Sequence, residues 1–320
     1  MKSPDNTQAV LAIDAGGTKC EVMLVAADGT LLQHCRLRDA DYGGRHPVII
    51  KRAVARVLGR RTPARLVVVG MGASAHYRLL PPRLRERCLP CHVSEEMSAL
   101  AAAGQPCGVV VIAGTGARAG ACLRDGRTVA LDALGPVLGD RGSGYSIGRE
   151  ALRAVAHAVQ MRQPATDLRE RVFRACGCGN LGELVTFSLL PRDRSLIASL
   201  ARIVNEEAGA GDVTAQRLLR EGARLMAGSV RDLVQLLGIG AEDYPLVGAG
   251  SVAVHSDLYW RELCRQVRII APRFRPQRVP VPPVAGLAAI GLRKMDAQQG
   301  PAAAQRLFAR LKQEDGIWQP

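Results

Sequence analysis

Aromatic residues are scarce in this chain, at 3% of its 320 residues. So few rings leave few platforms on which nucleic-acid bases could stack. No apolar run approaches the roughly 18 residues that a membrane-spanning helix needs, so we expect no membrane partner. Residues 1–6 are polar and unlike a secretory signal, and we expect a cytoplasmic protein.

Lysine is also rare, with five among the 43 basic residues, although the formal net charge is +14. The many arginines are scattered along the chain, whereas a nucleic-acid binder gathers its charge on one face. We therefore expect no nucleic-acid partner and keep such a binder as the least favoured alternative. An anionic nucleotide substrate fits the charge equally well.

No disulfide framework is indicated, because the nine cysteines are odd in number and irregularly spaced. Residues 88–92, Cys-Leu-Pro-Cys-His, have the spacing of a c-type haem attachment site. That chemistry requires export, so we interpret this string as a chance match. Cys176-Gly177-Cys178 lacks a second cysteine pair at zinc spacing and is interpreted as a turn.

Hydrophobic periodicity predicts strands and helices in two successive sets. Strands are expected at 10–13, 20–26, 30–35, 65–69, 92–94, 109–112, 120–123, 128–131 and 246–248. Helices are expected at 46–59, 79–87, 97–103, 146–160, 167–175, 181–190, 195–208, 213–237, 257–270, 285–295 and 302–312, with a connector over 272–283. A strand meander thus occurs twice, which predicts two related α/β domains facing each other across a cleft.

Three glycine-rich turns follow apolar strands in order along the chain. They are Asp14-Ala15-Gly16-Gly17-Thr18, Ala113-Gly114-Thr115-Gly116 and Val247-Gly248-Ala249-Gly250-Ser251. Such turns offer backbone N–H groups to phosphate with no side chain in the way. No Gly-x-x-x-x-Gly-Lys-Ser/Thr string is present, which excludes a Walker-type loop.

Each turn also carries polar side chains suited to a nucleotide. Asp14 is a hard oxygen ligand that suits hydrated Mg²⁺, and Thr18 adds a hydroxyl donor. The alternative for the first turn is an ordinary glycine hairpin. Gly114-Thr115-Gly116 repeats the same logic, and the pairing of the two turns favours the functional interpretation.

Two further places carry carboxylates. Asp140, within Gly139–Tyr145, either hydrogen-bonds substrate hydroxyls or caps the following helix. Glu95 and Glu96 follow a short strand and begin a helix. There the helix dipole stabilises carboxylates, and a general base facing the cleft is equally plausible.

A dehydrogenase is a competing hypothesis. Residues 70–75 fit the loose dinucleotide fingerprint, and Glu95 lies about twenty residues further on. A Rossmann domain does not open with two antiparallel meanders, however, and it leaves the other glycine turns unexplained. We therefore disfavour it.

Taken in order, these strings resemble the acetate and sugar kinase/actin superfamily. They are most similar to the BadF/BadG/BcrA/BcrD ATPase family, whose members include N-acetylglucosamine and glucosamine kinases. The likeness runs from residue 10 to about residue 293. It implies an α/β fold of two ribonuclease H-like (actin/hexokinase-type) domains flanking an ATP cleft. The expected boundaries are 1–112, 113–302 and a C-terminal helix and tail over 303–320.

The resemblance also implies roles for residues. The nucleotide is expected to contact Asp14, Gly16, Gly17, Thr18, Lys19, Gly114, Thr115, Gly116, Gly211, Asp212, Gly248, Gly250 and Ser251, with Mg²⁺ at Asp14. The expected substrate is a small sugar, and the resemblance favours an amino sugar such as N-acetylglucosamine or glucosamine. It is expected to contact Asp41, Gly72, Glu95, Thr115 and Asp140. Glu95 is the expected catalytic base, and relatives are often homodimers.

This chain departs from the family pattern at the sugar. Glu95 stands where the family usually has an aspartate, and Leu134-Gly135-Pro136 replaces a tryptophan-glycine segment. Asp39–Tyr42 lies where an asparagine is usual. These departures keep open a regulatory ATPase that couples nucleotide state to a protein partner. The family's dehydratase-activating branch holds an iron–sulfur cluster with cysteines, and we find no matching cysteine string.

Overall fold

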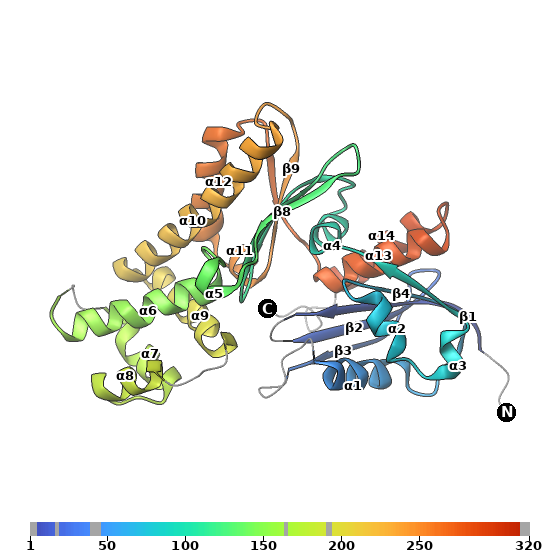
Figure 1. The fold of residues 1–320 in the computed structure, drawn as a ribbon, viewed down its shortest axis with the longest axis horizontal. Helices are drawn as coiled ribbons and strands as arrows, with labels where there is room; N and C mark the ends of the chain where they lie inside the picture. Colours follow the sequence, from blue (N-terminus) through green and yellow to red (C-terminus); the bar gives the residue numbers. More distant parts are fainter. Residues whose placement is uncertain (1–4, 17–18, 39–45, 163–165, 190–193, 314–320) are drawn as a thin grey trace. The chain divides into compact units, whose positions relative to one another are not determined.

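The computed structural model describes residues 5–16, 19–38, 46–162, 166–189 and 194–313. The chain divides into two compact units. The first unit consists of Met1–Pro106 and Val279–Pro320, and the second unit of Cys107–Arg278. Each unit is built around one five-stranded sheet (Figure 1).

The first unit has the strand order β3-β2-β1-β4-β5. The strands β1, β2 and β3 form an antiparallel meander, and β4 and β5 run parallel to β1. The strands are β1 (Asp5–Ala15), β2 (Cys20–Ala26), β3 (Leu31–Leu37), β4 (Pro63–Gly70) and β5 (Cys88–His92). The helices are α1 (Pro47–Leu58), α2 (Ala73–Arg78), α3 (Pro82–Arg85), α4 (Glu95–Ala102), α13 (Pro283–Met295) and α14 (Gly300–Gln313).

Helices cover both faces of this sheet (Figure 1). The apolar side of α1, with Ile49 and Val54, packs in one buried cluster with Leu11 and Ile13 of β1. On the opposite face, α13 packs against β1 and α4. A Cβ at Gly291 would collide with Val10, and one at Gly286 with the carbonyl of Ser98. Glycine at these positions therefore lets α13 approach the sheet and α4 closely.

The second unit repeats the same topology with the order β10-β9-β6-β7-β8. Its meander is β6-β7-β8, and β9 and β10 run parallel to β6. The strands are β6 (Gly108–Ala113), β7 (Ala117–Cys122), β8 (Thr128–Asp132), β9 (Pro245–Ala249) and β10 (Arg275–Arg278). The helices are α5 (Gly135–Leu138), α6 (Gly144–Val159), α7 (Leu168–Cys176), α8 (Leu181–Leu189), α9 (Arg194–Ala210), α10 (Val213–Leu237), α11 (Ser251–His255) and α12 (Asp257–Ile270).

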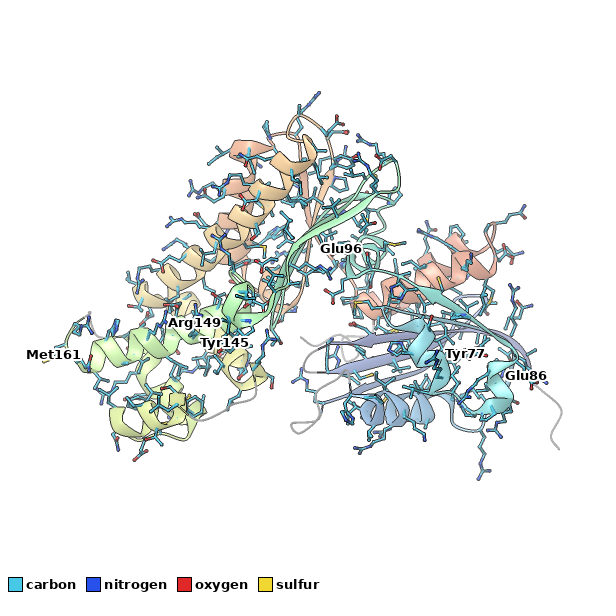
Figure 2. The ribbon with its side chains drawn as sticks, viewed as in Figure 1. Tyr77, Glu86, Glu96, Tyr145, Arg149 and Met161 are labelled. Atoms are coloured by element: carbon cyan, nitrogen blue, oxygen red, sulfur yellow. The ribbon has the colours of Figure 1, made fainter. Side chains whose placement is uncertain are left out.

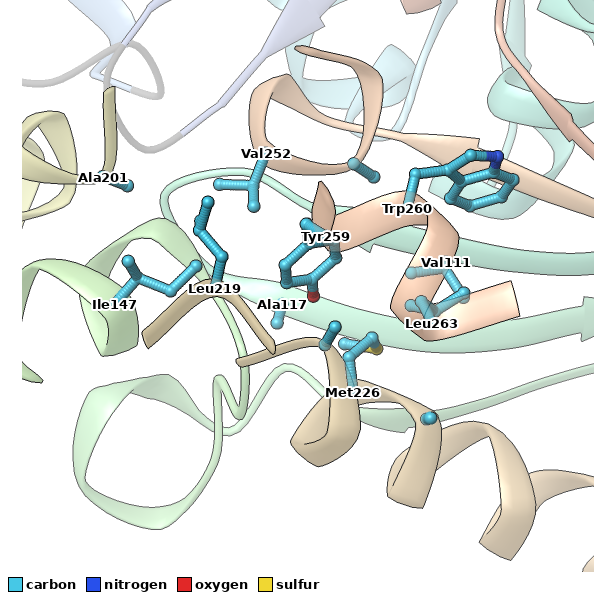
Figure 3. Packing of buried hydrophobic residues seen from close by; sticks show 14 of the residues in the cluster. Val111, Ala117, Ile147, Ala201, Leu219, Met226, Val252, Tyr259, Trp260 and Leu263 are labelled. Atoms are coloured by element: carbon cyan, nitrogen blue, oxygen red, sulfur yellow. The ribbon is translucent and has the colours of Figure 1, made fainter. Parts of the chain in front are cut away.

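The core of the second unit lies between its sheet and its helices. Figure 3 shows Tyr259 of α12 surrounded by side chains that include Ala117, Leu219 and Met226, all of one buried cluster. The Tyr259 ring is fully buried, and its hydroxyl donates a 2.9 Å hydrogen bond to the carbonyl of Gly142. A buried hydroxyl needs such a partner, so this bond ties the glycine-rich segment before α6 to the core.

The duplicated meander predicted from the sequence is confirmed, but several element predictions were wrong. The short strand lies at Cys88–His92 and not at 92–94, and the connector over 272–283 contains β10. The helix expected over 79–87 is only the single turn α3, preceded by the unpredicted α2. Pro90 is tolerated because β5 is an edge strand.

The division into units also differs from the expected boundaries. We expected a second domain over 113–302 and a tail over 303–320, whereas everything from Val279 onward belongs to the first unit. The physical reason is the packing of α13 on β1 and of α14 on α13. The second unit begins before β6, at Cys107.

Candidate functional site

Residues of the expected site gather at one edge of the first sheet. β1, β4 and β5 are parallel, with β4 in the middle. Parallel strands end at the same edge of a sheet, where ligands bind in open α/β folds. Asp14 lies near the end of β1, Gly72 follows β4, and Glu95 follows β5. Gly17, Thr18 and Asp41 lie outside the described residues, so the structure does not place them.

The first glycine turn is closed by its own backbone. The N–H of Gly16 donates to the carbonyl of Lys19 at 2.9 Å, which joins β1 to β2. Gly72 is the N-cap of α2, and a Cβ there would lie 3.2 Å from Nε2 of His76. The His76 side chain, on α2, is buried. Burial lowers the pKa of His76, and the nearby His92 lowers it further.

Glu95 and Glu96 begin α4 in different surroundings. Ser94 is the N-cap, and its hydroxyl accepts a 3.2 Å hydrogen bond from the N–H of Met97. Glu96, labelled in Figure 2, is only 1% exposed, whereas Glu95 is partly exposed. Only the Glu95 side chain is accessible to a substrate, although the helix dipole stabilises both carboxylates.

A cluster of charged groups that the sequence did not predict lies beside the first turn. Glu21 on β2 is 0% exposed. Its carboxylate accepts from Lys19 Nζ at 2.6 Å and from Arg36 Nη2 at 3.0 Å, and His34 Nε2 lies 3.0 Å away. Because a carboxylate can only accept, that histidine nitrogen carries the proton.

Lys19, expected to contact nucleotide, is thus held by Glu21. Burial by itself raises the pKa of Glu21. The hydrogen bond with His34 and the charges of Lys19 and Arg36 outweigh burial, and they lower this pKa to about 2. Glu21 is also the cross-strand partner of Asp14. The alternation of side chains along β2 could have predicted that Glu21 faces inward, but not which residues pair with it.

Replacing Glu21 with glutamine should destabilise the protein most at neutral pH. The pKa of Glu21 is lowered from 4.5 to about 2 on folding, so the carboxylate stabilises the fold above pH 4.5. That contribution is lost as the pH falls toward 2, because the unfolded chain takes up the proton first. The shift corresponds to roughly 3 kcal/mol.

Urea unfolding of wild type and Glu21→Gln between pH 7 and pH 3 would measure this effect. Glu86→Gln, an exposed glutamate of the same unit, is the matched control and should change little. A stability difference between wild type and Glu21→Gln that does not shrink below pH 4.5 would contradict the assignment.

In the second unit, two glycine corners touch each other. Gly114 follows β6 and Gly250 follows β9, and these two strands are parallel neighbours. Gly250 has φ +83°, and a Cβ there would lie 2.5 Å from the carbonyl carbon and oxygen of Ala113. Only glycine fits this junction. Ser251 begins α11 directly after it.

The Gly114–Gly116 loop also binds the first residues of α6. The N–H of Gly144 donates to the carbonyl of Gly114 at 2.7 Å, and that of Tyr145 to Thr115 at 3.2 Å. Three segments predicted to bind ligand, those at Gly114, Asp140 and Gly250, therefore meet in this unit.

The Asp140 carboxylate is buried, at 4% exposure, and already has partners. Oδ1 accepts the N–H of Ala117 at 3.0 Å, and Oδ2 pairs with the guanidinium of Arg194. A Cβ at Gly116 would lie 2.7 Å from Oδ1, so that loop also needs glycine. Asp140 does not cap α6, because Ser143 is the N-cap.

A hollow of about 280 Å³ adjoins this segment. Asp140, Tyr145 and Arg149 are among its lining residues, and Figure 2 shows the last two on α6. The guanidinium of Arg194 lies 5.9 Å from the centroid of the Tyr145 ring. The hollow thus offers arginine and tyrosine groups that can donate hydrogen bonds to a polar ligand.

Two other expected nucleotide contacts have structural duties. Asp212 is the N-cap of α10, and its carboxylate accepts from Ala215, Asp167 and the Thr166 hydroxyl at 2.7–2.8 Å. Gly248 lies inside β9, where a Cβ would collide with the Trp260 ring. No atom lies within 4 Å of the Cβ position at Gly211, so only the backbone φ of +107° favours glycine there.

Within the part of the chain that the structure describes, no three His, Cys, Asp or Glu side chains gather as a metal site. None of the helices that the structure describes has the length and apolar character needed to cross a bilayer.

Comparison with known proteins places these features. A model of the BadF/BadG/BcrA/BcrD ATPase family matches residues 11–268. The chain is 28% identical over 169 residues to an N-acetylmuramic acid/N-acetylglucosamine kinase of Clostridium acetobutylicum, covering 52% of this chain and 55% of that protein. It is 31% identical over 150 residues to an N-acetyl-D-glucosamine kinase of Dictyostelium discoideum, covering 46% and 47%. The chain spans about half the length of the curated relatives it matches.

A solved structure shares the fold over most of this chain. It is that of a candidate N-acetylglucosamine kinase from Chromobacterium violaceum, with a TM-score of 0.66 and 20% identity, covering 90% of this chain and all of that one. Two α/β units, each with a meander and a glycine corner after its first strand, define the actin-like ATPase fold, which confirms the expected fold class. Since the family model matches most of its length, the chain belongs to the BadF/BadG/BcrA/BcrD ATPase family.

Proposed function

We propose that this protein is an ATP-dependent kinase that phosphorylates a hydroxyl of an amino sugar, such as N-acetylglucosamine or glucosamine. The observation that carries the proposal is the pair of equivalent glycine corners, one after β1 and one after β6, in two sheets of identical strand order. Glycine corners of this kind let phosphates approach the backbone closely, because no side chain is in the way. Two curated relatives named as kinases of N-acetylglucosamine support the substrate class.

Residues of both units would serve one reaction. Gly16 and Gly114–Gly116 would bind phosphates, Gly250 and Ser251 the nucleoside, and Asp140 the sugar hydroxyls. Glu95, the accessible carboxylate after β5, would accept the proton of the attacking hydroxyl. Catalysis of this kind consists mostly of positioning and charge stabilisation.

Asp14 would hold Mg²⁺ through water. Asp14 is partly exposed, and a single carboxylate fits this ion, which commonly uses one or two carboxylates together with substrate phosphates. When bound, Mg²⁺ would neutralise charge on the phosphates. The homodimer and the cytoplasmic location stay predictions.

A panel of sugars tests the proposal directly. ADP release by the purified protein should require ATP together with N-acetylglucosamine, glucosamine or N-acetylmuramic acid, and the product should be the sugar phosphate by mass spectrometry. Absence of phosphorylated sugar across the whole panel would reject the kinase.

A regulatory ATPase is the second candidate. It is favoured by the Asp140 carboxylate, because both of its oxygens already have protein partners, Ala117 and Arg194. A sugar would have to add to or displace these contacts. Sugar-independent ADP release, stimulated by a protein partner, would favour this candidate over the kinase.

A further inference from the structure

Left-handed backbone gathers just before the Asp140 segment. Among the described residues, four non-glycine residues have positive φ, and three of them are Asp132 (+69°), Ala133 (+61°) and Asp140 (+57°). Non-glycine residues rarely adopt this conformation, and it persists only where the surroundings hold it. Such clusters accompany functional sites.

The contacts converge on the side chain of Asp132, at the end of β8. Its Oδ1 accepts the backbone N–H of Asp140 at 2.5 Å. Its Oδ2 accepts the N–H of Arg141 and the hydroxyl of Ser229, each at 3.3 Å. A Cβ at Gly139 would collide with Oδ1. The Asp132 carboxylate therefore lies inside the loop formed by residues 132–141 and accepts from two consecutive N–H groups at the end of that loop.

These bonds act on the backbone from which the Asp140 side chain projects. Asp140 keeps a φ of +57° while its carboxylate turns toward the N–H of Ala117. A change of φ at Asp140 would swing this carboxylate away from Ala117 and Arg194. Ala133, the neighbour of Asp132, anchors the same loop only through its own N–H, 3.0 Å from the carbonyl of Ala117.

We propose that Asp132 is a positioning residue, which fixes the Asp140 carboxylate for sugar binding through the backbone N–H groups of Asp140 and Arg141. The link to sugar rests on the proposed function. The holding of the loop does not rest on it, because it follows from the hydrogen bonds alone.

Substitution of Asp132 by glycine separates the effect of its hydrogen bonds from the effect of its positive φ. Asp132→Gly relieves the positive φ but removes both acceptor oxygens, so the sugar KM should rise at least tenfold while the KM for ATP changes less than twofold. Misplacing a group of the site by about 1 Å can lower the rate roughly a hundredfold. Ala133→Gly, at nearly the same φ, is the matched control and should leave both KM values unchanged.

Asp132→Asn gives a graded second variant. Asparagine retains one acceptor for the N–H of Asp140 but presents N–H₂ to Arg141, so its sugar KM should lie between those of wild type and Asp132→Gly. Near-wild-type melting temperatures would establish that each variant is folded.

Hydrogen exchange provides a readout independent of turnover. The amides of Asp140 and Arg141 should exchange at least tenfold faster in Asp132→Gly than in wild type or Ala133→Gly. If wild type phosphorylates no sugar, the proposed function fails, but this arm still tests the holding of the loop. Unchanged exchange in Asp132→Gly would overturn the proposal, and so would faster exchange with an unchanged sugar KM.

Discussion

Replacing Glu95 with glutamine should lower kcat for sugar phosphorylation by about 10²–10⁴-fold, the usual contribution of a general base. Glutamine keeps the size and hydrogen-bonding capacity of the side chain but cannot accept the proton. Glu95 follows β5 at the sheet edge shared with Asp14, and it is partly exposed, whereas Glu96 is 1% exposed. Binding of ATP should change little, since the loss falls on the chemical step.

Steady-state kinetics with the preferred sugar, together with ATP titration by calorimetry, would measure both quantities. Glu95→Asp restores the residue usual in the family and should recover part of the rate, and Glu86→Gln, exposed elsewhere in the same unit, should behave as wild type. A Glu95→Gln protein with undiminished kcat would remove Glu95 from the mechanism and leave the base unassigned.

Replacing Gly250 with alanine should both destabilise the second unit and weaken ATP binding at least tenfold. The added methyl group would lie 2.5 Å from the backbone of Ala113 and 2.8 Å from the nitrogen of Gly114. Backbone cannot move aside as a side-chain tip can, so the junction of the two corners must open. Such overpacking typically costs about 1–3 kcal/mol, beyond the cost of a positive φ.

Gly126→Ala is the matched control for this variant. Gly126 has φ +86°, close to the +83° of Gly250, but nothing lies within 4 Å of its Cβ position. Urea unfolding of both variants therefore separates the backbone cost from the collision. Equal stability losses, or unchanged ATP affinity in folded Gly250→Ala, would show that the corner tolerates a side chain and contradict its assigned role.

The sequence predicted those parts of the site that depend on local pattern. Glycine follows each of the apolar strands β1 and β6, at Gly16 and Gly114, as the sequence pattern predicted. The long helix α10 was also predicted with its observed bounds, because its apolar residues recur at helical spacing.

Partners far apart in the chain could not be predicted in this way. β10 reads Arg-Pro-Gln-Arg and has no strand pattern, yet it pairs with β9. Glu21 was not among the predicted site residues, because its partners His34 and Arg36 come from the next strand. The structure also gives Asp212 and Gly248 packing and capping contacts that the glycine pattern did not reveal.

The sequence by itself determined the two meanders, their glycine corners and the family resemblance, because strand period and backbone freedom are properties of adjacent residues. Only the tertiary structure decided that residues 279–313 return to the first unit, that Arg194 and Asp132 hold the Asp140 segment, and that Gly114 and Gly250 touch. The three contacts within the second unit join residues from 8 to 136 positions apart. Which segments meet depends on how whole sheets and helices bury their apolar faces together, and no local pattern encodes that.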